Sequence, residues 1–426
     1  MAGPIILANL STPLLGAVDT AVMGHLPDPA YLGGIAVGAL IFSYLYWGFG
    51  FLRMATTGLA AQAHGARDRA AQAEVFYRAA GLGAVIGLGL VALQNPLATA
   101  AFWLFDASAA VETLARDYYA ARIWSAPATL CNYVIFGWLL GAQKARSALA
   151  LQLALNVSNI LLDLAFVIGL GWGAAGVGAA SAIAEFTALA AGLWIVRHTL
   201  ADLKAPHPAL SRLCDGAAIR RLFALNRDLF IRTACLISVF ALITRAGAQM
   251  GDVILAANAV LLTFQSFLSF GLDGFAHAAE ALVGGALGAR NRHSLRTMVI
   301  TTTQWALGLA VLYTLVFALA GPWIIATLTN IVTVRVAAGQ VLPWIIASPL
   351  VSVWCFQLDG IFIGATRTGV MRSAMILSLA GFVIALFVLQ GRYGNPGLWA
   401  AFLLFQALRG LTLGARYPAL ERTVPQ

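Results

Sequence analysis

Two carboxylates lie inside long apolar stretches, where an acidic side chain needs a chemical reason to be present. Asp19 falls in a stretch near residues 3–24 and Asp163 in one near residues 147–170, and each stretch is long enough to cross a bilayer. An aspartate at the centre of a membrane helix costs about 2.5 to 3.5 kcal/mol on insertion scales. Packing alone does not account for that cost, so ion or proton handling is the predicted role.

Asp163 belongs to a polar stripe. Asn159 lies four residues before it and Asn156 three residues before Asn159, so the three side chains share one face of a helix. We expect this face to point into the interior of a helix bundle. A buried carboxylate binds a proton more readily than one in water, because its charged form loses hydration. Such a group can load a proton from one side of a membrane and release it to the other.

The elements that position these residues follow from composition. Of the 426 residues, 61% are hydrophobic and 10% are charged, and the mean hydropathy is +0.85. At about 20 residues per span, the apolar stretches fit roughly twelve transmembrane helices. The fold class is therefore an all-α integral membrane protein. Predicted spans lie near residues 3–24, 32–62, 77–104, 118–141, 147–170, 174–197, 220–246, 252–284, 297–320, 335–363, 370–390 and 397–418.

The distribution of Lys and Arg predicts the orientation. Nineteen of them fall on the side reached after even-numbered spans, a count that includes Arg409, and four fall on the opposite side. The positive-inside rule then places both termini in the cytoplasm of a multi-pass protein of the cytoplasmic (inner) membrane. Topology also explains the net charge of +9, so no nucleic-acid surface is inferred.

An internal repeat predicts two bundles. Residues 65–69 (Gly-Ala-Arg-Asp-Arg) reappear as residues 288–292 (Gly-Ala-Arg-Asn-Arg), an offset of 288 − 65 = 223, and Gly141-Ala142 matches Gly364-Ala365 at the same offset. A constant offset indicates duplication of a six-span unit, with parallel repeats related by a pseudo-two-fold axis. The predicted domains are an N-terminal six-helix bundle (1–197), a cytoplasmic linker (198–217) and a C-terminal six-helix bundle (218–426).

Transporters built from two such halves typically alternate access by rocking one half against the other around a central site. The energy source predicted for this chain is an ion gradient. The two lysines, Lys144 and Lys204, follow no glycine spacing of a phosphate loop, which argues against a nucleotide-driven pump. His277 and Glu280 lie three residues apart without further ligands nearby in sequence, so no metal and no cofactor is expected.

Several segments resemble one known family along essentially the whole chain. They are Pro4–Ser11, Val18–Gly24, Phe51–Gly58, Gly137–Gln143, Asp273–Ala276 and Asp359–Thr366. They resemble the multidrug and toxic compound extrusion (MATE) transporters, specifically their DinF-like branch. The resemblance implies an exporter of hydrophobic or cationic drugs that works by antiport of protons or sodium ions.

The resemblance also implies site residues. Asp19 matches the first-helix Asp that is central to proton coupling in archaeal and bacterial members. Asn159 and Asp163 match a fifth-helix Asn and Asp, Ser181 falls where a sixth-helix Thr is common, and Asn132 corresponds to a fourth-helix Asn. With Asn156, these residues form the predicted proton-coupling group.

A hinge is predicted in the first span. Pro4 and Pro13 each lack a backbone donor and weaken the helix around them. The hypothesis is that protonation of Asp19 changes its hydrogen bonds and lets the helix bend, which reshapes the cavity and expels substrate. For Pro13, a tolerated membrane-helix proline is the alternative.

Three alternatives stay open. Glu185, Asp273, Glu280 and Asp359 are further acids within predicted spans, and the last three keep open a sodium-coupled reading with a cation site in the C-terminal half. A lipid-linked precursor flippase of the same superfamily needs a basic cavity, whereas the interior charges outside Arg53, Arg232 and Arg245 are mostly acidic. A membrane-embedded enzyme needs a metal motif or an activated nucleophile, and neither is recognised, so the chain is expected not to be an enzyme. Its expected partners are small drugs and the bilayer, and a monomer is expected.

Overall fold

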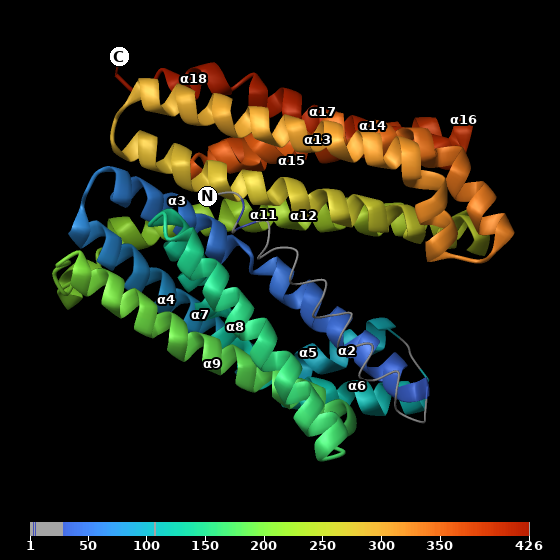
Figure 1. Cartoon of the computed structure of the whole chain (residues 1–426), viewed down its shortest axis with the longest axis horizontal. Coiled ribbons are helices and arrows are strands. Elements are labelled where there is room, and N and C mark those ends of the chain that lie inside the picture. The colour runs from blue at the N-terminus through green and yellow to red at the C-terminus, as the bar shows by residue number, and fades with distance from the viewer. Residues whose placement is uncertain (1–2, 4, 6–28, 106–107, 426) are drawn as a thin grey trace. The chain divides into compact units, whose positions relative to one another are not determined.

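The computed structural model describes residues 3, 5, 29–105 and 108–425, and it is helical almost throughout (Figure 1). No β-strand occurs within these ranges. Eleven helices among the described residues are long and apolar enough to cross a membrane. The predicted all-α membrane fold is confirmed, while nearly all of the first predicted span falls outside the described residues.

The chain divides into two compact units, Gly3–Phe223 and Ala224–Gln426. The predicted domain limits, with residues 198–217 as a linker, stay a prediction. The helices of the first unit are α2 (Pro29–Gly48), α3 (Phe51–Gly65), α4 (Arg69–Ala92), α5 (Gln94–Phe105), α6 (Ala109–Arg122), α7 (Ala126–Gly141), α8 (Ala145–Asp163), α9 (Gly173–Asp202) and α10 (Leu210–Leu213).

Helix α11 (Gly216–Gln249) crosses the boundary between the units. The second unit continues with α12 (Asp252–Gly288), α13 (Arg292–Leu328), α14 (Val332–Gly364), α15 (Thr368–Ala385), α16 (Gly391–Tyr393), α17 (Asn395–Gly414) and α18 (Tyr417–Glu421). Its largest buried cluster includes Phe264, Phe382 and Trp399, and the indole nitrogen of Trp399 donates to Asn258 Oδ1 at 2.8 Å. This bond satisfies a polar group that burial would otherwise leave unpaired.

Helix ends repeat between the units at the offset found in the sequence. Arg67 and Arg290 have φ angles of 56° and 51°, in the left-handed region that closes a helix end. The next residue caps the following helix in both places: Asp68 accepts from the Ala71 amide at 2.9 Å, and Asn291 accepts from the Ser294 amide at 2.8 Å. In both units, the five-residue motif thus ends one helix and caps the start of the next.

Close helix crossings repeat as well. A Cβ at Gly137 would collide with the Arg53 carbonyl of α3, and one at Gly360 would collide with the Ala276 carbonyl of α12. Gly360 follows Gly137, and Ala276 follows Arg53, by 223 residues. Glycine therefore lets α7 pack on α3, and α14 on α12, backbone to backbone. We call the residue 223 positions later the counterpart of a residue in the first unit.

Three predicted spans are interrupted. The span predicted at 32–62 breaks between α2 and α3 at residues 49–50, and the one at 77–104 breaks between α4 and α5 at Leu93. The one at 118–141 contains a short 3₁₀ turn, Ile123–Ser125. Hydropathy averages over a window, so it gives the length of an apolar stretch but not a break within it.

Candidate functional site

Three of the predicted site residues lie outside the described residues. They are Asp19, which carries the predicted first-helix carboxylate, and the hinge candidates Pro4 and Pro13. Their roles stay predictions.

The polar stripe of α8 is buried. Asn156, Asn159 and Asp163 are 5%, 2% and 0% exposed, whereas the neighbouring Val157 and Leu161 are 52% and 60% exposed. Since exposure alternates around the helix in this way, the three polar side chains share its inward face. The predicted stripe is therefore a buried face of one helix.

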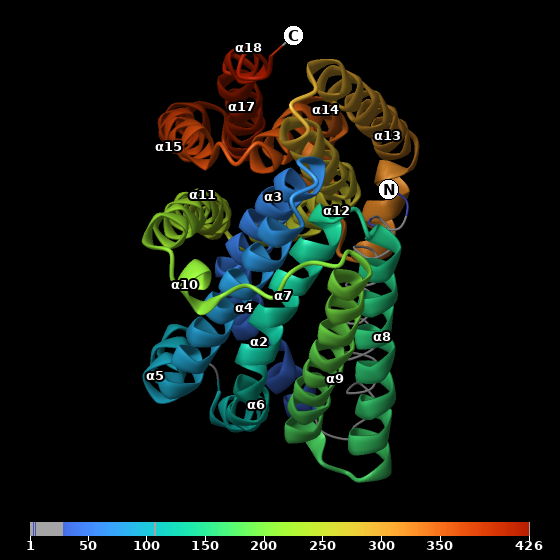
Figure 2. The ribbon, with the colours of Figure 1, turned by 90° about the vertical axis from the view of Figure 1, so that its left-hand side faces the viewer.

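Helix α9 packs beside α8 within the first unit (Figure 2). The side-chain nitrogen of Asn159 lies 3.5 Å from the hydroxyl oxygen of Ser181 on α9, which is 5% exposed. On the same stripe, Gln152 Nε2 donates to Asn156 Oδ1 at 3.1 Å. The structure thus brings together two of the predicted coupling residues, Asn159 and Ser181, across a helix interface.

Asp163 is the last residue of α8 and is followed directly by a π-helical turn, Leu164–Gly169. Single π-helical turns in α-helices are frequent at functional sites, and here the turn extends the C-terminal end of α8. The second unit has a π-helical turn at Leu386–Gln390, which begins one residue before the counterpart of Leu164. The turn belongs to the repeated scaffold, whereas the aspartate does not.

The counterparts of the polar stripe are all apolar. Asn156, Asn159, Asp163 and Ser181 correspond to Leu379, Phe382, Leu386 and Leu404. Phe382 is fully buried in the core of the second unit. The repeated helix pair is therefore built without polar groups at these positions, so folding of the scaffold does not require them in the first unit.

Asn132 contacts a different group from the stripe. It lies on α7, is 1% exposed, and its Nδ2 donates to both the backbone oxygen of Glu185 at 2.9 Å and the carboxylate Oε2 of Glu185 at 2.7 Å. The sequence indicated Glu185 as an intramembrane acid but did not join it to Asn132. That pairing depends on how α7 and α9 pack, which no spacing along the chain reveals.

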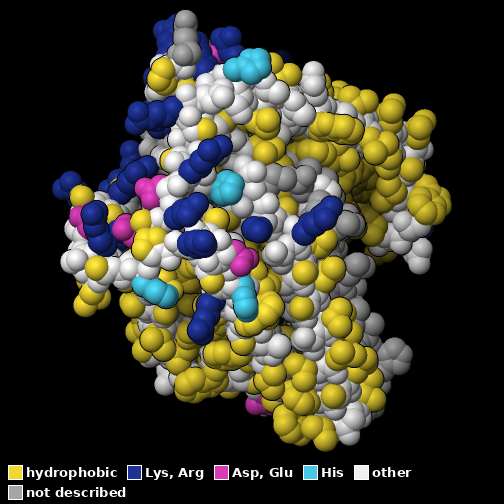
Figure 3. Space-filling view, turned by 60° about the vertical axis from the view of Figure 1, so that its left-hand side comes forward, with side chains coloured by type: hydrophobic (Ala, Val, Ile, Leu, Met, Phe, Trp, Pro, Cys, Tyr) yellow, Lys and Arg dark blue, Asp and Glu magenta, His cyan; other side chains and the backbone are white. Residues whose placement is uncertain are grey.

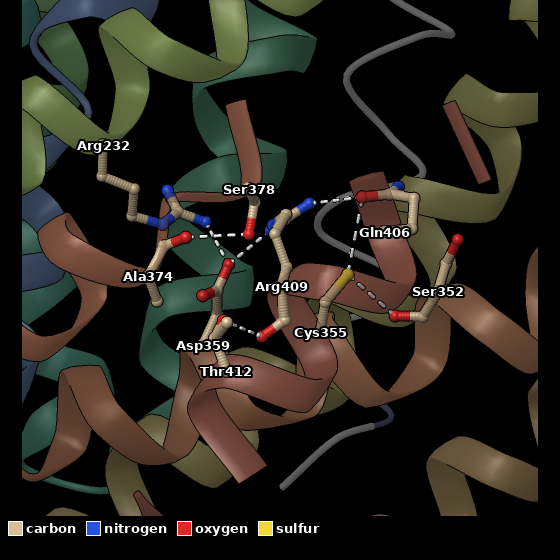
Figure 4. Close-up of polar contacts among 9 residues, drawn as sticks. All are labelled: Arg232, Ser352, Cys355, Asp359, Ala374, Ser378, Gln406, Arg409 and Thr412. Atoms are coloured by element: carbon tan, nitrogen blue, oxygen red, sulfur yellow. Dashed lines mark hydrogen bonds and ion pairs between the residues drawn. The ribbon is translucent and has the colours of Figure 1, made fainter. Parts of the chain in front are cut away.

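The second unit holds a buried ion cluster at Asp359 (Figure 4). Oδ2 of Asp359, on α14, accepts from Arg409 Nη2 of α17 at 2.6 Å and from Arg232 Nη2 of α11. Asp359, Arg232 and Arg409 are 5%, 8% and 3% exposed. Arg409 also donates to Gln406 Oε1 at 2.6 Å, and the Cys355 thiol lies 3.6 Å from that oxygen.

This cluster corrects one sequence prediction. Arg409 was counted with the basic residues at the cytoplasmic surface, but its guanidinium is buried in α17 and neutralises Asp359. Sequence reasoning also gave no role to Gln406. Their spacing of three residues within an apolar span was the available signal, since it places both on one helix face.

The two other acids of the predicted C-terminal cation site lie on α12. Glu280 is 1% exposed and Asp273 is partly buried. Two guanidinium groups already contact Asp359, which makes it a poor ligand for an additional cation. The C-terminal cation site stays a prediction. No group of three or more His, Cys, Asp or Glu within the described ranges is arranged to hold a metal ion.

Comparison with protein-family models matches residues 4–165 and 229–389 to MatE. The chain belongs to the MatE family. The model matches two separate segments, one in each half of this MatE chain, in agreement with the internal repeat. The resemblance to MATE transporters of the DinF-like branch is confirmed.

Curated relatives cover nearly the whole chain. DNA damage-inducible protein F of Escherichia coli (strain K12) is 43% identical over 97% of this chain and 90% of that protein. Protein DETOXIFICATION 44, chloroplastic, of Arabidopsis thaliana is 26% identical over 97% of this chain and 80% of that protein. The probable multidrug resistance protein NorM of Synechococcus sp. is 26% identical over 96% and 90%.

Solved structures share the fold. An outward-facing multidrug resistance MATE family transporter of the MOP superfamily aligns with a TM-score of 0.87 and 18% identity, covering 99% of this chain and 95% of that one. A MOP superfamily transporter from Pyrococcus furiosus aligns with a TM-score of 0.85 and 16% identity, covering 100% and 94%. This chain is therefore a multi-pass membrane protein with the MATE transporter fold.

Proposed function

We propose that this chain is a secondary active exporter of hydrophobic or cationic drugs, driven by inward proton flow across the cytoplasmic membrane. The names of relatives such as the probable multidrug resistance protein NorM support drugs as the substrates. The observation that carries the proton coupling is the buried stripe of Asn156, Asn159 and Asp163, whose counterparts are apolar. A costly polar group that the repeated scaffold does not need is retained for its chemistry.

In this proposal Asp163 and Asp19 exchange protons with the two sides of the membrane in turn. Asn159 and Ser181 supply neutral donors and acceptors beside the stripe, so they stabilise the cluster in either charge state. When a carboxylate gains a proton it also gains a donor, and its hydrogen bonds change. The first span then bends near Pro4 or Pro13, and the change in shape releases the drug.

Sodium coupling in the C-terminal half is the second candidate. It would use Asp273, Glu280 and Asp359, but the paired arginines at Asp359 weigh against it. The same ion cluster weighs against a flippase that holds pyrophosphate on Arg232 or Arg409, because both guanidiniums already contact a carboxylate.

The proposed orientation places both termini in the cytoplasm. We also propose that the chain is a monomer. Figure 3 shows Lys and Arg side chains on part of the visible face and hydrophobic side chains elsewhere on it. Basic side chains are typical of the loops of a membrane protein that face the cytoplasm.

The test is efflux of ethidium from proteoliposomes under an imposed proton or sodium gradient. The native chain should export ethidium with the proton gradient, and Asp19→Asn should abolish that export. Asp68→Asn is the matched control, because Asp68 is an exposed helix cap and its counterpart is already Asn291. Export driven by sodium alone would overturn proton coupling, and no export under either gradient would overturn the antiporter.

A further inference from the structure

Glu185 is a further intramembrane carboxylate of the first unit, and proton coupling at α8 does not use it. It lies on α9 about 18 Å along the helix from Gly173, well inside the span Gly173–Asp202. The described residues provide no ion pair to it. Arg122 of α6 is close enough to act on Glu185 through space, but its guanidinium donates to the Tyr118 hydroxyl and lies over the Phe42 ring. Among the described residues, the carboxylate therefore has a hydrogen bond from Asn132 and a cation within electrostatic reach, but no ion pair.

Asn132 holds Glu185 in place and offers a further acceptor. Its Nδ2 group uses both hydrogens on Glu185, one on the backbone oxygen and one on the carboxylate. Its own Oδ1 is buried and has no hydrogen-bond partner among the described residues. A buried acceptor without a partner is energetically unfavourable, because it has lost its hydrogen bonds to water. Oδ1 and the carboxylate both accept hydrogen bonds, so a positively charged donor could satisfy both.

The repeat argues against a purely structural role for this pair. The counterpart of Asn132 is Cys355 and the counterpart of Glu185 is Leu408, each again 223 residues later. Helices α14 and α17 thus pack with no acid at this position. The carboxylate on α9 is an addition to the scaffold of the first unit.

Two tyrosines belong to the surroundings of Glu185. Tyr46 of α2 and Tyr133 of α7 are both close enough to Glu185 to interact with it electrostatically, and Tyr46 is 5% exposed. Aromatic rings attract cations through their electron-rich faces. A carboxylate beside tyrosines in an apolar span is a suitable environment for a flat organic cation.

We propose that Glu185 and Asn132 bind the positively charged group of the exported drug, an organic ammonium. This inference rests on the proposed export function and adds a cation subsite to it. Glu185 lies four residues after Ser181, so the two side chains occupy successive turns of α9. Helix α9 thus carries Glu185, which contacts α7, and Ser181, which contacts α8. A shift of α9 would therefore change both the cation subsite and the proton-coupling stripe.

The test is direct binding to the purified chain in nanodiscs at fixed pH. The probes are ethidium and an uncharged phenanthridine with the same ring system. Loss of a charged hydrogen-bond partner lowers affinity by at least about tenfold, so Glu185→Gln should weaken ethidium binding by that factor and leave the uncharged ring unchanged. Glu112→Gln, an identical change at an exposed pair with Arg116, should alter neither.

The outcomes separate this subsite from the export function. Ethidium binding that is unchanged in Glu185→Gln, or equal losses for both probes, would overturn the subsite even if proton-driven efflux is observed. Ethidium binding that depends on Glu185 in a chain that exports nothing under either gradient would keep the subsite and overturn the export function. Absence of ethidium binding to the native chain would overturn both.

Discussion

Arg409 and Asp359 form a buried ion pair of 2.6 Å that joins α17 to α14. Arg232 of α11 contacts the same carboxylate oxygen, so three helices of the second unit meet at one charge. A buried ion pair contributes little net stability, but removing one partner leaves an uncompensated buried charge. We therefore interpret Asp359 as a residue that stabilises the packing of these three helices.

Asp359→Asn should therefore destabilise the protein strongly. Removal of one partner of a buried pair costs about 3 to 5 kcal/mol, because two guanidiniums lose their counter-charge. Thermal unfolding of the purified protein should show a lower midpoint than the native chain. Asp252→Asn, at an exposed site in the first turn of α12, should leave the midpoint nearly unchanged. An Asp359→Asn midpoint equal to the native one would show that the cluster is not structural.

Gly360→Ala should also destabilise, by a different mechanism. The added methyl group collides with the Ala276 carbonyl, and backbone cannot move aside as a flexible side chain can. Overpacking of this kind costs about 1 to 3 kcal/mol. Gly308→Ala is the control, since a Cβ there meets nothing within 4 Å on α13. Alanine is the better helix former, so the control should not lower the thermal midpoint.

Ser181 should act through its hydroxyl. Ser181→Ala removes the group 3.5 Å from Asn159, whereas Ser181→Thr keeps it. Proton-driven ethidium efflux from proteoliposomes should be slowed severalfold in Ser181→Ala and largely retained in Ser181→Thr. Equal rates in the alanine and native proteins would remove Ser181 from the coupling group.

A native cysteine tests the orientation. Cys214 is exposed between α10 and α11, in the segment predicted to be cytoplasmic, whereas Cys235 and Cys355 are buried. A membrane-impermeant maleimide should label inside-out vesicles but not intact cells. Cys214→Ser should remove the labelling. Labelling of intact cells at Cys214 would reverse the proposed topology.

Much of the scaffold was predictable from sequence because its signals are local or periodic. The length of the apolar stretches predicted the spans, and the fixed offset between residues 65–69 and 288–292 predicted the duplication. The stripe through Asn156, Asn159 and Asp163 was also predictable, because helical spacing alone puts these residues on one face.

The interhelical contacts were not predictable in this way. Arg409 was assigned to the cytoplasmic surface because a single arginine in a span is interpreted as a surface residue until its partner on another helix is known. The same limit hid the bond from Asn132 to Glu185, whose residues lie 53 positions apart on helices that meet only in the folded unit. Spacing orders residues on one helix, whereas packing decides which faces meet.

Proton release on drug binding tests most directly whether the stripe on α8 couples protons to transport. The purified chain, in weakly buffered solution with a pH-sensitive dye, should release protons when ethidium is added. Asp163→Asn should reduce that release, and the exposed control Asp68→Asn should match the native protein. Release from Asp163→Asn equal to that of the native chain would contradict proton coupling at this stripe.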